Sequence, residues 1–232
     1  LGLSCHVQLE NRVSDMPPPY HRSGNVLLSK LFGASSSTFH IGEDEAAADA
    51  NIADIAKDYA KKGKKPYLLT LSPDTKPLGA LGYIRCAGEI LDQLNNQKQS
   101  VEKIVVASGS AATHVGILLG LRLLGSETPV HGICVRRDKD QQILRVEGIV
   151  RLAEHLIGCG KVVQGKDIKC HDDWLAPGYG KTNGLVHEAM MLAGSLEGMI
   201  VDPVYTAKSL AGSIGLYRLG IFNNSQNILY LH

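Results

Sequence analysis

The 232-residue chain has few aromatic side chains and almost no excess of charge of either sign. Aromatic residues make up 5% of it, and 24 basic against 23 acidic residues leave a net charge of +1. Such a chain offers neither the aromatic platforms on which nucleic-acid bases stack nor the positive field that attracts nucleic acid or anionic membranes. We therefore expect no nucleic-acid partner.

Long apolar runs and paired cysteine motifs are also missing. No apolar run approaches the roughly 20 residues that a membrane-spanning helix needs, so we expect no membrane partner. No CxxC pair occurs, which argues against a zinc site, and we expect no metal. Most of the cysteines lie in apolar stretches such as Val130–Val135, which predicts reduced, buried thiols in a cytoplasmic protein. The cysteines are Cys5, Cys86, Cys134, Cys159 and Cys170.

Short apolar runs alternate with amphipathic stretches along the whole chain, a pattern typical of an α/β protein with a mainly parallel sheet. The expected strands are Cys5–Leu9, Thr38–Ile41, Tyr67–Leu71, Lys103–Ala107, Val130–Val135, Met199–Val201 and Asn227–Leu231. The expected helices are Ser23–Phe32, Glu45–Lys62, Ala80–Asn96, Thr113–Leu124, Gln141–Ile157, Leu185–Leu196 and Ala207–Leu219. Two prolines in the loop Ser72–Pro77 exclude regular structure and predict a domain boundary there.

One stretch carries a strand directly into a small, hydroxyl-rich turn and then a helix. It reads Ser108-Gly109-Ser110-Ala111-Ala112-Thr113. The first N–H groups of a helix have no intrahelical acceptor, and together with the helix dipole they bind phosphate well. Hydroxyls at Ser108, Ser110 and Thr113 would add donors. The spacing fits neither GxGxxG nor a Walker loop, so a plain serine-capped turn explains it equally well.

Two further stretches place an aromatic residue in a loop. In Ala176–Gly180, two glycines flank Tyr179, an arrangement suited to covering a flat ligand or delivering a proton. In Asp202–Lys208, Tyr205 and Thr206 follow an apolar strand, where α/β sheets collect ligands. Taken alone, a surface turn and an N-capping threonine explain these two stretches well.

Together these stretches resemble the D-cysteine desulfhydrase and 1-aminocyclopropane-1-carboxylate deaminase family of fold-type II enzymes, which depend on pyridoxal 5'-phosphate (PLP). The family shows a Ser-Gly-Ser-Ala-Gly-Thr loop, an Ala-Pro-Gly-Tyr-Gly loop and an Asp-Pro-Val-Tyr-Thr-Gly-Lys turn. Its Leu-Gly-Ala-Leu-Gly-Tyr segment appears here as Leu78–Tyr83. The four segments occur in the family's order, and the resemblance covers essentially the whole chain.

The resemblance implies an α/β fold with two open parallel-type sheets flanked by helices, similar to the tryptophan synthase β subunit. It implies that residues 1–77 are the remainder of a small domain, that residues 78–232 are the large PLP-binding domain, and that the protein is a homodimer. Ser108, Gly109, Ser110, Ala111, Ala112 and Thr113 would hold the cofactor phosphate. Thr206 would bond the pyridine nitrogen. Tyr205 would stand near the substrate, and Tyr179 would lie against the cofactor or transfer a proton.

The implied reaction is an α,β-elimination on a small amino acid, with D-cysteine giving pyruvate, ammonia and sulfide. Relatives that deaminate aminocyclopropane carboxylate usually carry Glu at the position of Thr206. A neutral hydroxyl there does not enforce a protonated pyridine, which favours the desulfhydrase side. Cysteate lyases typically carry Ser, and they remain competitors, as do the deaminases and a catalytically inactive, truncated homologue that binds a small ligand.

The sequence also departs from the family pattern. Relatives extend beyond both ends, and their N-terminal part carries the Schiff-base lysine, so Leu1 matches sequence downstream of it. We expect the chain to be part of a longer enzyme and assign no catalytic lysine among Lys76, Lys181 and Lys208. Ala112 and Ala207 replace family glycines, and a methyl group fits there only if φ is negative. The unusual loop Pro73–Pro77 leaves the substrate open.

Overall fold

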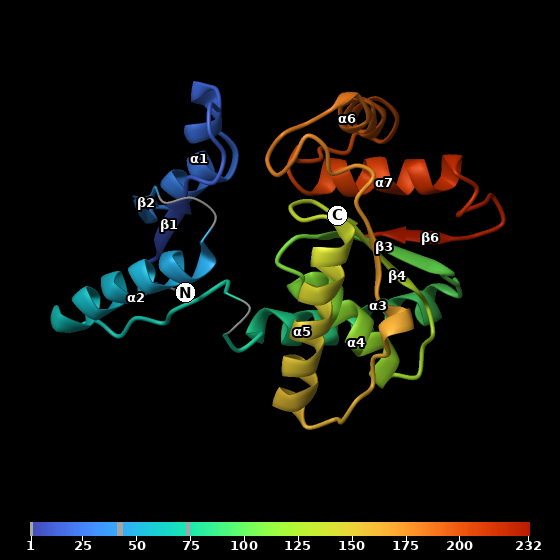
Figure 1. Cartoon of the computed structure of the whole chain (residues 1–232), viewed down its shortest axis with the longest axis horizontal. Helices are drawn as coiled ribbons and strands as arrows, with labels where there is room; N and C mark the ends of the chain where they lie inside the picture. Colours follow the sequence, from blue (N-terminus) through green and yellow to red (C-terminus); the bar gives the residue numbers. More distant parts are fainter. Residues whose placement is uncertain (1, 41–43, 73–74) are drawn as a thin grey trace. The chain divides into compact units, whose positions relative to one another are not determined.

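The structure, a computed structural model, describes residues 2–40, 44–72 and 75–232 (Figure 1). It divides into two compact units, Leu1–Thr75 and Lys76–His232. The expected boundary between residues 77 and 78 falls two positions after this division. The residues 41–43 and 73–74, which include the end of the expected strand Thr38–Ile41 and part of the boundary loop, lie outside the described residues.

The first unit contains a small parallel sheet, in which β1 (His6–Glu10) pairs with β2 (Ser35–Phe39). Between the strands lie the 3₁₀ turn η1 (Pro18–His21) and the helix α1 (Gly24–Leu31). The long helix α2 (Glu45–Lys61) follows, and Asp44 caps it by accepting hydrogen bonds from the amides of Ala46 and Ala47. Val13 and Ala48 are the buried hydrophobic residues among the described part of this unit. The main core of the chain therefore lies in the second unit.

The second unit is built on a four-stranded parallel sheet with the order β5-β4-β3-β6. The strands are β3 (Lys103–Ser108), β4 (Val130–Cys134), β5 (Lys169–His171) and β6 (Ile228–Tyr230). The helices are α3 (Leu78–Gln97), α4 (Ala112–Leu123), α5 (Lys139–Ile157), α6 (Gly184–Glu197) and α7 (Thr206–Arg218), and a 3₁₀ turn, η2, spans Gly165–Asp167. The parallel sheet with helices on both faces confirms the α/β fold class expected from the sequence.

The two faces of this sheet bury two separate cores, because successive side chains of a strand point to opposite faces. Ile104 and Val106 of β3 pack with α3, α4 and α5, whereas Val105 packs with α6 and α7. Figure 1 shows these two groups of helices on opposite sides of the sheet. Both faces of β3 are thus covered, which is why the strand reads as a continuous apolar run rather than as an alternating one. Packing on both faces therefore holds the carboxyl end of β3 between the two layers of helices.

Helices α3 and α4 cross at close range because α4 presents glycines to α3. A Cβ atom added at Gly116 would lie 2.4 Å from both the carbonyl oxygen of Ala80 and Cβ of Tyr83. At Gly120 it would lie 2.7 Å from Cβ of Ala87. This crossing fixes Tyr83 beside the start of α4, where it lines the pocket described below.

The sequence predicted the positions of the long elements, and the differences concern short ones. Tyr67–Leu71 is not a strand, because it has no hydrogen-bonded neighbour strand in the described residues, and the amides of Leu71 and Ser72 bond to the Asp49 carboxylate instead. Met199–Val201 is not a strand either, since the Met199 amide bonds to the end of α6 at Ala193. The sequence analysis missed β5, whose Lys-Cys-His sequence buries only its central cysteine.

The structure tests two expectations, that the cysteines are buried and that no helix spans a membrane. Cys134 and Cys170 are buried, Cys86 and Cys159 are half-buried, and Cys5 is exposed, so the expectation of buried thiols does not hold for Cys5. Within the described residues, every helix is too short or too polar to cross a lipid bilayer.

Candidate active site

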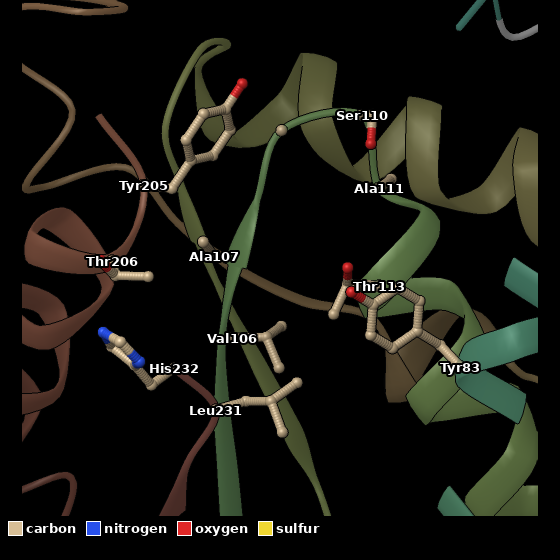
Figure 2. A pocket seen from close by; sticks show the side chains of 11 residues that line it. Tyr83, Val106, Ala107, Ser110, Ala111, Thr113, Tyr205, Thr206, Leu231 and His232 are labelled. Carbon is tan, nitrogen blue, oxygen red and sulfur yellow. The ribbon is translucent and has the colours of Figure 1, made fainter. Parts of the chain in front are cut away.

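A pocket opens at the carboxyl end of β3, at the point where the chain leaves the sheet for α4 (Figure 2). Its volume is ≈ 240 Å³. Four parts of the second unit line it: the end of β3 with the following turn, the start of α4, the start of α7, and the segment after β6, with Tyr83 of α3 completing the wall. The lining residues are Tyr83, Val106, Ala107, Gly109, Ser110, Ala111, Thr113, Tyr205, Thr206, Leu231 and His232.

The turn between β3 and α4 contains two backbone features that require small residues. A Cβ atom at Gly109 would lie 2.9 Å from Cγ2 of Val135 and 3.4 Å from Cε1 of Tyr205, so any larger residue would push these side chains away. Ala111 adopts a left-handed conformation with φ +76° at the position before α4. Ala112 and Ala207 lie in helices with negative φ, so the methyl groups that replace family glycines are tolerated there.

Side chains of the β4–α5 segment hold the carbonyl groups of this turn. The carbonyl oxygen of Gly109 accepts hydrogen bonds from Nη1 of Arg137 at 3.1 Å and from Nε2 of Gln142 at 3.2 Å. The carbonyl oxygen of Ser110 accepts one from Nε of Arg145 at 3.1 Å. The first amide groups of α4 have no intrahelical acceptor, so they are available to a ligand in the pocket.

Ser108, the first residue of the expected phosphate loop, does not line the pocket. It is fully buried, and its hydroxyl lies 3.1 Å from Nδ1 of His114 and accepts a hydrogen bond from Nε2 of Gln142 at 2.8 Å. Ala112 also lies outside the lining. Among the expected loop residues, the structure therefore brings Gly109, Ser110, Ala111 and Thr113 to the pocket, whereas the Ser108 side chain supports the turn from behind.

Tyr205, which lines the pocket, pairs with Tyr179, which is not among the lining residues. Their hydroxyl oxygens lie 2.7 Å apart, and the two rings meet edge to face with their centroids 6.0 Å apart. The guanidinium carbon of Arg136 lies 5.9 Å from the centre of the Tyr179 ring. Burial, and after it the neighbouring Tyr179, raises the pKa of the Tyr205 phenol above its ordinary value. At neutral pH Tyr205 therefore holds a proton that it can donate.

The turn that carries Tyr179 is fixed by a buried lysine. Nζ of Lys208 donates hydrogen bonds to the carbonyl oxygens of Leu175 at 3.0 Å and of Gly178 at 2.6 Å. The Lys208 side chain is fully buried, and burial lowers its pKa to about 8. This lysine is thus committed to the turn, and the described residues that line the pocket include no lysine.

Thr206 begins α7 and shares a closed set of hydrogen bonds with Asp202. Its hydroxyl donates to Oδ2 of Asp202 at 2.8 Å and accepts from the Asp202 amide at 2.7 Å. Asp202 also accepts the amides of Val204, Tyr205 and Thr206 at 2.8–2.9 Å. This set ties the Thr206 hydroxyl to Asp202, and Thr206 lines the pocket.

Sequence reasoning missed several residues around the pocket. Asp202 lies inside a stretch that was singled out, and an Asp-Pro pair before a helix could have marked it as a turn residue whose carboxylate accepts nearby amides. Tyr83 also lies in a segment that was quoted, but nothing in that segment pointed to the pocket. Gln142, Arg137 and Arg145 lie on the next β–α unit, and no local pattern signals their contacts with the turn.

Comparisons with known proteins identify the family of the chain. The whole chain, residues 1–232, matches the family described as pyridoxal-phosphate dependent enzyme. The chain belongs to this family of PLP-dependent enzymes. The family, the fold class and the cofactor expected from the resemblance are thereby confirmed.

The chain is similar to curated and structurally characterised relatives along its full length. It is 35% identical to a D-cysteine desulfhydrase of Salmonella paratyphi A and 34% identical to one of Serratia proteamaculans, over 232 residues and 68% of each relative. It resembles the crystal structure of an ACC deaminase homologue with a TM-score of 0.80 and 30% identity, covering 100% of this chain and 66% of that one. O-ureido-L-serine synthase shares the fold alone, at 11% identity and a TM-score of 0.61. The chain thus spans about two thirds of the length of these relatives.

The residues at the pocket fit a phosphorylated ring. The turn needs glycine at Gly109 because a side chain there would collide with Val135, and its carbonyls are tied back by α5. A phosphate requires such a backbone, free of side chains and rich in amide donors. Thr206 lies on the opposite side of the pocket from Ser110 and Thr113, whereas the Tyr205 ring lies beside Gly109 of the turn (Figure 2).

Proposed function

We propose that the protein containing this chain catalyses the PLP-dependent α,β-elimination of a small amino acid, with D-cysteine as the substrate. One D-cysteine and one water would give one pyruvate, one ammonia and one hydrogen sulfide. The observation that carries the proposal is the 34–35% identity with D-cysteine desulfhydrases along all 232 residues. The site geometry agrees with it, because the turn, Tyr205 and Thr206 meet at one pocket.

Each part of the pocket has a distinct task in this proposal. Bound PLP supplies an electron sink for the α-carbon of the amino acid. The amides of Gly109, Ser110 and Ala111 and those at the start of α4 hold the phosphate, with hydroxyl donors from Ser110 and Thr113. Thr206 bonds the ring nitrogen on the opposite side of the pocket. Ser108 contributes through the turn that it supports, not through a direct contact.

Tyr205 and Tyr179 handle the proton in this proposal. The raised pKa keeps the Tyr205 phenol protonated at neutral pH, so its hydroxyl is a donor toward the leaving sulfur rather than a base. Tyr179 orients that hydroxyl from 2.7 Å away. The leaving sulfur gains a proton when it is expelled, so this position needs a proton donor and not a base. The protonated phenol of Tyr205 meets that need.

Thr206 separates this proposal from the deaminase alternative. A carboxylate at this position would face the ring nitrogen directly, whereas this chain offers a hydroxyl with a carboxylate behind it. The proposal also includes a cytoplasmic homodimer that acts on a small amino acid without a nucleic-acid or membrane partner.

A substrate panel tests the proposal. The protein is incubated with PLP and separately with D-cysteine, L-cysteine, cysteate and aminocyclopropane carboxylate, and pyruvate, 2-oxobutyrate and sulfide are measured. We expect sulfide and pyruvate in equal amounts from D-cysteine, and a smaller rate from each other substrate. Tyr217→Phe is the matched control for a later Tyr205→Phe variant, since Tyr217 lies on the exposed side of α7 and its hydroxyl bonds to Asn224. PLP binding without product from any substrate would refute the catalytic proposal and favour a ligand-binding homologue.

A further inference from the structure

Arg136 reaches the pair of tyrosines from the strand next to β3. The carboxyl ends of β3 and β4 meet at one edge of the sheet, because Ser108 pairs with Cys134 and its carbonyl oxygen accepts the Val135 amide at 3.1 Å. Arg136 follows directly and is half-buried. Its guanidinium carbon lies 5.9 Å from the centre of the Tyr179 ring, close enough for the ring face to attract the cation. A positive charge therefore stands beside this pair.

The charge lies on the side of the pocket where the Tyr205 hydroxyl lies. The hydroxyl oxygens of Tyr179 and Tyr205 are 2.7 Å apart, so Arg136, Tyr179 and Tyr205 form a continuous series of contacts. The Tyr205 hydroxyl extends away from Thr206 and His232, which line another part of the pocket (Figure 2). Arg136 thus acts on the phenol of Tyr205 rather than on the wall that contains Thr206.

Tyr205 acquires a negative charge whenever it gives up its proton, and most of its surroundings oppose that charge. Burial, the neighbouring Tyr179 and the carboxylate of Asp202 all raise the pKa of the Tyr205 phenol, whereas Arg136 lowers it. An acid whose anion is not stabilised donates its proton poorly. The cation of Arg136 is the group that offsets this difficulty.

We propose that Arg136 is a positioning residue for proton donation, which holds Tyr179 against Tyr205 and stabilises the negative charge that forms on the Tyr205 oxygen as its proton passes to the leaving sulfur. The Cβ–S bond of the substrate breaks and its electron pair stays on sulfur, which takes the proton. The O–H electron pair stays on Tyr205, and water later returns a proton to it. This inference rests on the proposed function, because it takes Tyr205 to be the donor.

The proposal distinguishes substrates by their leaving groups. D-cysteine expels a sulfur that needs a proton, whereas 3-chloro-D-alanine expels chloride, the anion of a strong acid, which needs none. Loss of the Arg136 charge should therefore slow the first reaction and spare the second. A residue that bound the substrate carboxylate would instead raise KM for both substrates, and a residue that only supported the fold would slow both reactions equally.

The kinetic test compares Arg136→Gln with the wild type, each loaded with PLP. We expect kcat for D-cysteine to fall about tenfold with KM unchanged, since a positioned charge acts on the donor and not on substrate binding. Pyruvate formation from 3-chloro-D-alanine should keep the wild-type rate. Arg136→Lys retains a cation near the ring and should recover most of the lost rate. Arg85→Gln, which removes an arginine on the exposed side of α3, is the matched control and should change neither reaction.

A spectroscopic test measures the same coupling without substrate. Tyr205 is replaced by 3-fluorotyrosine, whose phenol is more acidic than that of tyrosine, and its fluorine chemical shift is followed by NMR against pH in the PLP-loaded protein. Removing a nearby cation destabilises the ionised phenol. Arg136→Gln should therefore raise the pH of the transition by about one unit, a tenfold loss of acidity, and Arg85→Gln should leave it in place.

The outcomes separate this inference from the proposed function. If the wild type releases sulfide from D-cysteine but Arg136→Gln leaves the fluorine titration unchanged, or slows the reactions of both substrates equally, the inference is overturned and the proposed function stands. If the wild type releases no sulfide from D-cysteine, the proposed function fails and the inference fails with it. A shifted titration together with a loss of rate confined to D-cysteine supports both.

Discussion

The hydroxyl oxygens of Tyr179 and Tyr205 lie 2.7 Å apart, although the two residues are separated by 26 positions in the chain. They come from different elements: Tyr179 from the loop before α6, and Tyr205 from the residue that precedes α7. The contact exists because Lys208 holds the first loop from α7. The pair thus depends on Lys208, whose hydrogen bonds go to the backbone of the loop and not to either tyrosine hydroxyl.

Removing the Tyr179 hydroxyl should change the ionisation of Tyr205. Burial raises the pKa of Tyr205 most, and Tyr179 adds to the rise, so Tyr179→Phe leaves the burial effect but removes the second contribution. We expect Tyr205 to ionise at a lower pH in this variant. Ultraviolet titration of tyrosinate in Tyr179→Phe, compared with Tyr179→Phe/Tyr205→Phe to identify the transition, measures the shift. An unchanged transition would mean that the two hydroxyls do not interact.

Lys208→Met should loosen the Tyr179 turn and alter how stability depends on pH. The variant leaves the carbonyls of Leu175 and Gly178 without their donor, which costs about 1–3 kcal/mol at neutral pH, offset in part by the removal of a buried charge. Urea unfolding at pH 7 measures this difference, and Lys181→Met is a control in the exposed part of the neighbouring loop.

The difference in stability between the wild type and Lys208→Met should change with pH in a direction that the pKa of Lys208 determines. The pKa of Lys208 is about 8 in the folded protein and 10.5 for an ordinary lysine, so between these values the unfolded chain binds more protons than the folded one. Stability from this group therefore rises as pH increases through this window. The stability of the wild type relative to Lys208→Met should increase from pH 8 to pH 10.5. A relative stability that falls over this window would show that the lysine is not destabilised by burial.

Gln142→Leu should weaken phosphate binding from a distance. The Gln142 amide connects the Ser108 hydroxyl and the Gly109 carbonyl, and without it the turn loses two of the contacts that direct its amides into the pocket. We expect about tenfold weaker binding of PLP, equivalent to about 1.4 kcal/mol. Gln141→Leu changes the adjacent, exposed glutamine and should leave binding unchanged. Equal affinities for the two variants in fluorescence titration would contradict the role given to Gln142.

Substitution of alanine for Gly148 and for Gly116, on neighbouring helices, should change the stability of the fold in opposite directions. Gly148→Ala in α5 meets no atom within 4 Å and should stabilise the fold by about 0.5–1 kcal/mol, because alanine loses less conformational entropy in a helix. Gly116→Ala in α4 places a methyl group 2.4 Å from the Ala80 carbonyl oxygen and should destabilise it by about 1–3 kcal/mol. Thermal unfolding of both variants checks the prediction, and stabilisation by Gly116→Ala would show that α3 and α4 are not closely packed.

The fold was largely predictable because its main elements carry strong local signals. The buried strand at β3 is a continuous apolar run, and α5 has an Asp138 cap at one end and Gly158 in a left-handed conformation at the other. The three-residue strand β5 has no such signal, since its position depends on pairing with β4. Met199–Val201 has the composition of a strand, but its backbone is engaged by the end of α6 instead.

The sequence motifs predicted which segments form the site, but they did not predict the hydrogen bonds that hold those segments in place. The matched segments located the turn, Tyr179, Tyr205 and Thr206, because these lie in local patterns. The inward orientation of Ser108 depends on Gln142, 34 positions away. Such contacts depend on how α5 packs on the sheet, which no local pattern encodes.

The most direct test of the account is the rate of sulfide release from D-cysteine, measured with and without added PLP, for the wild type and for Tyr205→Phe. The account predicts release that requires PLP and falls by about 10²–10⁴ in Tyr205→Phe, the usual effect of removing a positioned proton donor, while Tyr217→Phe keeps the wild-type rate. Wild-type release that is absent with PLP, independent of PLP, or unchanged in Tyr205→Phe would contradict it.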